Sequence, residues 1–67
     1  MEITLNGERR DVPDAANLQE LLDSLRLSTE GGMAVLLNGE VARRGDWAAT
    51  GLRPEDELEI VRATVGG

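Results

Sequence analysis

The sequence contains no cysteine, no histidine and no lysine, and Trp47 is its only aromatic residue. Without cysteine the chain can form neither a disulfide nor a thiolate metal site. Without histidine or cysteine it also lacks the commonest catalytic bases and nucleophiles. We therefore expect a protein that is not an enzyme, with no catalytic residue, no bound cofactor and no metal of its own.

Length and charge narrow the class further. A chain of 67 residues is one domain at most. Its formal net charge of −6 repels nucleic acid and anionic membranes. No apolar run approaches the roughly 18 residues of a membrane span, and no signal peptide is visible. We expect a cytoplasmic monomer whose partners are other proteins.

The first half of the chain has the pattern of a hairpin followed by a helix. Residues 2–5 alternate polar and apolar, as a half-buried strand does. Asn6-Gly7 is typical of a type I′ turn, because both positions tolerate positive φ. The charged segment 8–12 then reads as a second strand on a sheet edge, where charge discourages unwanted pairing. A solvated loop is the alternative for that segment.

The helix is the clearest element in the sequence. Asn17 is placed to cap it, with Glu20 three residues later completing a variant capping box. Four leucines follow at i, i+3, i+4 and i+7 spacing, so they share one helical face: Leu18, Leu21, Leu22 and Leu25. The pattern is too short for a coiled coil, and we expect it to pack on a sheet. Gly31-Gly32 interrupts the chain after this helix.

The second half is dominated by strands. Met33, Val35 and Leu37 would share one face of a buried strand. A second Asn-Gly turn at 38–39 and a short strand at 40–42 follow. The remaining expected segments are an irregular region at 43–53, a turn at 54–56 and a last strand at 57–63.

This order predicts an α+β fold with a mixed four- to five-stranded sheet and one main helix packed on one face. The first and last strands can then lie side by side in parallel in the interior of the sheet. Leu36 and Val61 would point away from the helix and form a small apolar patch for partner docking. Alternatively, the irregular region covers them. Trp47 is expected to anchor that region in the core.

Charged clusters give weaker signals. The basic pairs Arg9-Arg10 and Arg43-Arg44 could form a phosphate site, but no interleaved aromatic residues accompany them, which favours a solvated surface. The acidic residues between 55 and 59 could bind a metal. Strand alternation separates them, which favours a solvated face that meets a basic partner.

The chain ends with Thr64, Val65, Gly66 and Gly67. We expect residues 1–63 to form the folded domain and residues 64–67 to be its flexible tail. Four extended residues reach roughly 13 Å at about 3.3 Å each, enough to enter a partner's channel. Glycine has no Cβ, so that channel can be narrow. The tail can therefore deliver its terminal carboxylate to the site of another enzyme.

Several segments together carry a resemblance to a known family. They are "LNGEV" at 37–41, Trp47 within "GDWAAT", "DELEIV" at 56–61 and the terminal Gly66-Gly67. The chain resembles, over essentially its whole length, the ThiS family of sulfur carrier proteins of thiamin biosynthesis, which have the ubiquitin-like β-grasp fold. The small sulfur-carrier subunit of molybdopterin synthase is a similar alternative. The residues "TV" at 64–65 depart mildly from the ThiS pattern, because many members carry further small residues there.

The resemblance implies a role for Gly67. An adenylating enzyme of the ubiquitin-activating type would use ATP and Mg²⁺ to activate the Gly67 carboxylate. A persulfide protein would supply sulfur, and the resulting thiocarboxylate would donate it to thiazole synthase. Gly66 would provide clearance, while Thr64 and Val65 complete the arm. Two other classes stay open from the residues alone: a ubiquitin-like protein modifier, and an interaction module with an incidental tail.

Overall fold

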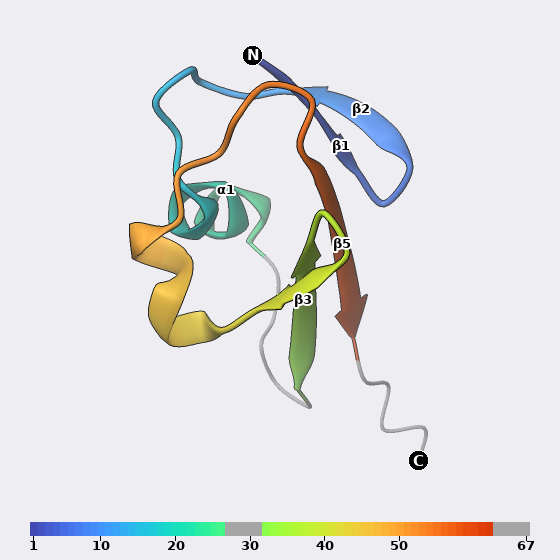
Figure 1. The fold of residues 1–67 in the computed structure, drawn as a ribbon, viewed down its shortest axis with the longest axis vertical. Helices are drawn as coiled ribbons and strands as arrows, with labels where there is room; N and C mark the ends of the chain where they lie inside the picture. Colours follow the sequence, from blue (N-terminus) through green and yellow to red (C-terminus); the bar gives the residue numbers. More distant parts are fainter. Residues whose placement is uncertain (27–31, 63–67) are drawn as a thin grey trace.

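The computed structural model describes residues 1–26 and 32–62, and within them five strands form one mixed sheet (Figure 1). The sheet order is β2-β1-β5-β3-β4. The strands are β1 (Glu2–Leu5), β2 (Glu8–Asp11), β3 (Met33–Leu37), β4 (Glu40–Ala42) and β5 (Glu57–Arg62). The predicted α+β sheet is therefore confirmed, with five strands, and the charged segment after the first turn is an edge strand rather than a loop.

The two strands from opposite ends of the chain lie together in the middle of the sheet. β1 and β5 pair in parallel, with Thr4 opposite Glu57 and Leu5 opposite Leu58. β5 pairs antiparallel with β3 on its other side. This arrangement confirms the predicted interior parallel pair. It also makes β5 the strand through which the two hairpins are joined.

Both hairpins turn at the predicted Asn-Gly pairs. Asn6 and Gly7 have φ values of 48° and 82°, and Asn38 and Gly39 have values of 52° and 85°. Positive φ at both central positions is the geometry of a type I′ turn, whose twist matches that of the flanking strands. Asparagine and glycine tolerate this region better than other residues, so these two dipeptides fix the hairpin registers.

The helix α1 (Leu18–Leu25) covers one face of the sheet (Figure 1). Its capping box is present: the Asn17 side chain accepts from the backbone N–H of Glu20 at 2.8 Å, and the Glu20 side chain accepts from that of Asn17 at 3.1 Å. Leu18, Leu21 and Leu22 are buried. The helix ends at Leu25, where Arg26 adopts a left-handed conformation with φ of 51°. No sequence signal indicated that stop.

The region expected to be irregular contains a 3₁₀ helix, η1 (Arg44–Ala49), and that part of the prediction was wrong. The indole of Trp47, 4% exposed, donates a hydrogen bond to the carbonyl oxygen of Ala42 at 2.9 Å. Burial of this large ring holds the segment against the core and favours one compact conformation over an extended loop. The prediction that Trp47 anchors this region is confirmed. Among the described residues, no helix is long and apolar enough to cross a membrane.

The core lies between the sheet and the two helices. It is formed by the inward side chains of three strands, the buried face of α1, Trp47 and two connecting segments: Ile3, Leu5, Val12, Ala16, Leu18, Leu21, Leu22, Val35, Trp47, Leu52 and Leu58. The described residues include no buried polar or charged side chain. The hydrophobic effect is therefore the main force that holds this small domain together.

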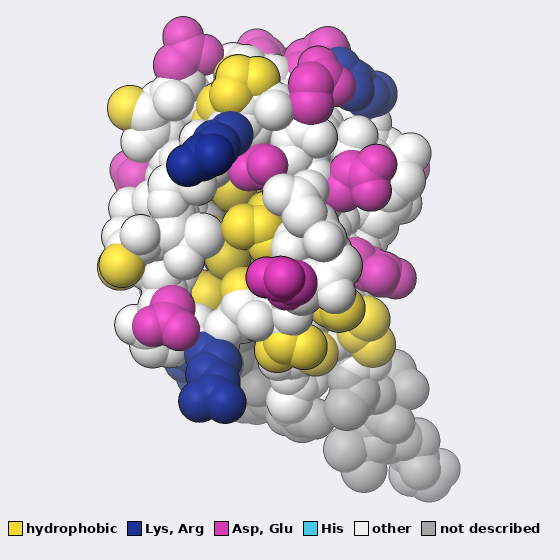
Figure 2. Space-filling view, viewed as in Figure 1, with side chains coloured by type: hydrophobic (Ala, Val, Ile, Leu, Met, Phe, Trp, Pro, Cys, Tyr) yellow, Lys and Arg dark blue, Asp and Glu magenta, His cyan; other side chains and the backbone are white. Residues whose placement is uncertain are grey.

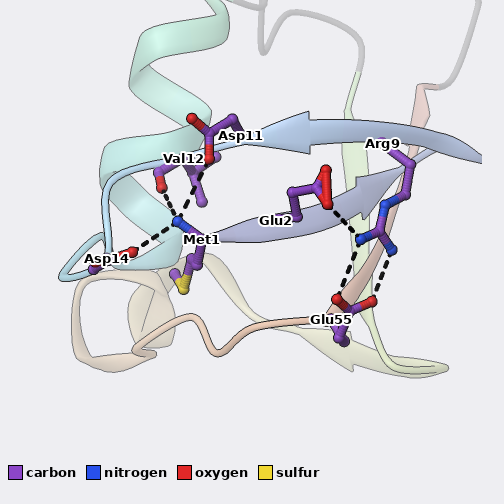
Figure 3. Close-up of polar contacts among 7 residues, drawn as sticks. All are labelled: Met1, Glu2, Arg9, Asp11, Val12, Asp14 and Glu55. Atoms are coloured by element: carbon purple, nitrogen blue, oxygen red, sulfur yellow. Dashed lines mark hydrogen bonds and ion pairs between the residues drawn. The ribbon is translucent and has the colours of Figure 1, made fainter.

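Ion pairs and hydrogen bonds link the first hairpin to neighbouring segments of the chain (Figure 3). On the face away from α1, the guanidinium of Arg9 contacts Glu55 at 2.7 Å and Glu2 at 2.8 Å. The hydrogen bond from Arg9, together with its charge, lowers the pKa of Glu55 below its usual value. Near the start of β1, the Met1 ammonium donates to Asp14 at 2.7 Å and lowers the pKa of that carboxyl.

We expect Leu18→Ala to destabilise the domain by about 2–5 kcal/mol, because it leaves a cavity at a side chain that is 0% exposed. The measurement is urea unfolding followed by the fluorescence of Trp47. The control is Val41→Ala, at a side chain that is 69% exposed, where we expect a change within about 0.5 kcal/mol. Equal losses for the two variants would contradict this description of the core.

The Arg9–Glu55 ion pair predicts an acid-dependent contribution to stability. Because the folded-state pKa of Glu55 is depressed, the pair stabilises the fold above the ordinary pKa of 4.5, and this contribution is lost as the pH falls through the depressed value. The stability difference between wild type and Arg9→Gln should therefore shrink between pH 7 and pH 3, by urea titration. Arg10→Gln changes the net charge equally and should show a smaller pH-dependent difference; identical behaviour would contradict the assignment.

Candidate functional site: the tail-bearing strand and the open sheet face

The predicted tail, Thr64, Val65, Gly66 and Gly67, lies outside the described residues, as does the proposed domain boundary at 63. Their roles stay predictions. The structure does describe the strand that precedes them in the chain. β5 ends at Arg62 and runs away from the end of the molecule where the N-terminus lies (Figure 1). β5 has a neighbouring strand on each side at its start, but its pairing with β1 ends at Leu58, whereas its pairing with β3 continues to Arg62.

Leu36 and Val61 lie on the sheet face opposite α1, as predicted. Their neighbours Val35, Leu58 and Ile60 pack on the helix side, and side chains alternate between the two faces of a strand. Val61 is 49% exposed and Leu36 is half-buried. The 3₁₀ helix contacts α1 and buries Trp47 on the other side of the sheet. It therefore does not cover Leu36 and Val61.

Val41 belongs to the same surface, and the sequence analysis missed it. It pairs directly with Leu36 across the β3–β4 hairpin, and its side chain is 69% exposed. Val61 lies diagonally from Leu36 on β5, since Leu36 pairs with Glu59. We call Leu36, Val41 and Val61 the apolar patch. The register fixed by Asn38-Gly39 was sufficient to place Val41 opposite Leu36, so the signal was present in the sequence.

Acidic groups border the apolar patch. A shallow hollow beside it is lined by Thr4, Asn6, Leu36, Glu57 and Glu59, among others. Asp and Glu side chains are also spread across the face of the molecule seen in Figure 2. Apolar side chains surrounded by negative charge favour a partner that presents an apolar surface with basic residues around it.

One arginine of each basic pair makes a contact within the domain. Arg9 is engaged with Glu2 and Glu55, as described above. The guanidinium of Arg44 lies 5.6 Å from the centroid of the Trp47 ring, within the range of a cation–π contact. Residues 1–26 and 32–62 contain no group of three or more acidic side chains that could hold a metal ion. In the acidic segment, Asp56 accepts from the backbone N–H of Arg53 at 2.8 Å and thus stabilises a turn.

The mixed sheet, with its interior parallel pair and a helix across one face, defines the ubiquitin-like β-grasp class. Comparison with solved structures agrees. The crystal structure of a thiamine biosynthesis protein (ThiS) from Geobacter metallireducens matches with a TM-score of 0.84 and 33% sequence identity, covering 100% of both chains. The solution structure of a thiamine biosynthesis protein from the same organism matches with a TM-score of 0.80 and 33% identity, covering 100% of this chain and 88% of that one.

The model of the ThiS family matches residues 3–67. No curated protein matches the chain. The family match and the similar structures cover nearly the whole sequence, and the chain therefore belongs to the ThiS family. It is a small sulfur carrier protein of thiamin biosynthesis rather than an enzyme.

Proposed function

We propose that this carrier transports sulfur on its C-terminal glycine, as a thiocarboxylate that is consumed in thiazole formation. The observation that carries the proposal is the ThiS family match, which extends through Gly67 and so includes the terminal Gly-Gly. The fold adds support, because the tail follows directly from the interior strand β5. β3 pairs with β5 as far as Arg62, so the strand is held by the sheet up to the last described residue before the tail.

The chemistry begins with a carboxylate, which is a poor electrophile because its charge is delocalised. An oxygen of the Gly67 carboxylate attacks the α-phosphate of ATP, and pyrophosphate leaves. The product is an acyl-adenylate, in which AMP is a good leaving group. Mg²⁺ and cationic groups of the adenylating enzyme stabilise the charge that develops on the phosphates.

Sulfur enters in the second step. The terminal sulfur of a protein persulfide attacks the acyl carbon, and AMP leaves, so that an acyl disulfide joins the two proteins. A dithiol reductant then cleaves the sulfur–sulfur bond and is itself oxidised to a disulfide. It leaves a thiocarboxylate on Gly67 and releases the donor as a thiol. Thiazole synthase is the proposed acceptor, and the nucleophilic sulfur passes to its substrate.

The composition of the carrier is consistent with a reaction in which its partners supply the catalytic groups. It contains no histidine and no cysteine, so acid–base catalysis and covalent sulfur chemistry would be supplied by its partners. The carrier provides the terminal carboxylate, the tail that extends it into the partner's site, and a surface that the partner recognises. We propose the apolar patch, with Leu36 and Val61 as predicted and Val41 in addition, as the surface where the adenylating enzyme docks.

Intact mass spectrometry tests the proposed chemistry. The chain is incubated with ATP, Mg²⁺, a candidate adenylating enzyme and a cysteine-derived persulfide donor. We expect a mass increase equal to the replacement of one oxygen by sulfur, located at Gly67. The variant that lacks Gly67 should show no increase. If the wild-type mass stays unchanged with an enzyme that converts an established carrier, the proposed function is wrong.

The docking surface predicts a change in KM. Val61→Asp places a charge in the apolar patch, and we expect the KM of adenylation for the carrier to rise about tenfold, which corresponds to about 1.4 kcal/mol. Ala48→Asp introduces the same charge at an exposed position of η1 and should leave KM within about twofold. Pyrophosphate release measures both, and unfolding curves verify that the variants fold. Equal effects of the two substitutions would exclude the patch as the docking surface.

A further inference from the structure

The side chain of Asn6 continues the β1–β5 ladder beyond the point where β1 ends. The backbone N–H of Thr4 donates to the carbonyl of Asp56 at 2.9 Å, and that of Asn6 donates to the carbonyl of Leu58 at 2.8 Å. In a continued parallel ladder, the N–H of Ile60 would bond to the backbone carbonyl of residue 6. The Asn6 side-chain oxygen accepts that hydrogen bond instead, at 2.8 Å.

This contact extends hydrogen bonding on the β1 side of β5. The paired register with β1 ends at Leu58, whereas β3 pairs with β5 as far as Arg62. Asn6 thus holds β5 at Ile60, two residues beyond the last β1 partner. Ile60 is close in the chain to the tail, so the hydrogen bond acts near the base of the segment that carries Gly67.

We propose that Asn6 is a positioning residue for the reaction at Gly67, an inference that rests on the proposed function. By holding β5 at Ile60 on the side where β1 has ended, it restricts the movement of the strand that leads into the tail. A reaction that needs correct placement of its reacting groups is sensitive to such a restriction.

The residue type at this position serves two purposes. φ at Asn6 is 48°, a conformation that asparagine, aspartate and glycine accept most readily. Of these, asparagine and aspartate also provide an oxygen that can accept from Ile60. Asn6→Gly therefore keeps the turn geometry and removes the acceptor, and Asn6→Asp keeps both.

Asn38 provides a matched control within the same chain. It occupies the equivalent position of the second type I′ turn, with φ of 52°. Its side-chain oxygen accepts from the backbone N–H of Glu57 at 2.9 Å, and its side-chain amide donates to Asp56 at 3.0 Å. Asn38 thus holds β5 at its beginning. Asn38→Gly should weaken the fold in the same manner without loosening the strand near the tail.

The experiment combines two measurements on the full-length chain. Amide hydrogen exchange by NMR reports the Ile60 N–H directly, and we expect at least tenfold faster exchange in Asn6→Gly than in wild type. Adenylation kinetics, with the carrier concentration varied, should show kcat lowered about threefold to tenfold. KM should change little, because the apolar patch is intact. Asn6→Asp should restore most of kcat, and Asn38→Gly should leave kcat within about twofold of wild type.

The outcomes separate the possibilities. Unchanged exchange at Ile60 in Asn6→Gly would overturn the inference at its first step. Faster exchange with unchanged kcat, or an equal loss of kcat in Asn38→Gly, would overturn the positioning role. If the wild-type chain is not adenylated by an enzyme active on an established carrier, the proposed function fails and the positioning role with it. The exchange rates alone would then still show whether Asn6 holds the strand.

Discussion

Pairing of β5 on both of its sides is the interaction on which the rest of the structure depends. β1 brings the first hairpin to one side and β3 brings the second hairpin to the other. Leu58 of β5 contributes to the core beneath α1, and Val61 contributes to the opposite face. The same strand leads into the segment that ends at Gly67. A change in β5 would therefore affect the sheet, the core, the docking surface and the tail together.

A domain of this size buries a smaller fraction of its surface than a larger domain does, so few residues are available both to form the core and to contact a partner. Here the division follows the two faces of the sheet. The face beneath α1 carries the core. The other face carries the Arg9–Glu55 ion pair on its β2–β1 half and the apolar patch on its β3–β4 half. An exposed ion pair contributes only modestly to stability, so most of the stability comes from the core on the α1 side, and the apolar patch on the other face remains exposed for recognition.

Much of the fold followed from local patterns in the sequence. The Asn-Gly turns, the Asn17 capping box and the leucine spacing of α1 each depend on residues that are close in the chain, and each is confirmed. The anchoring of Trp47 was predicted, but the 3₁₀ helix around it was not, because the backbone conformation of that segment depends on packing against residues distant in the chain. The left-handed conformation of Arg26, which follows the end of α1 at Leu25, was not predicted either, because a left-handed arginine has no distinctive sequence signal.

The sequence by itself determined the five strands, the helix α1 and the interior parallel pair. Its terminal Gly-Gly and family resemblance also indicated the class of carrier. The Asn38-Gly39 register was enough to place Val41 beside Leu36, but only the tertiary structure showed that Asn38 holds β5 at Glu57 and Asn6 holds it at Ile60. The physical reason is the range of the interactions involved. Turn and helix preferences act over a few residues, whereas a hydrogen bond between Asn6 and Ile60 exists only after strands from both ends of the chain have come together.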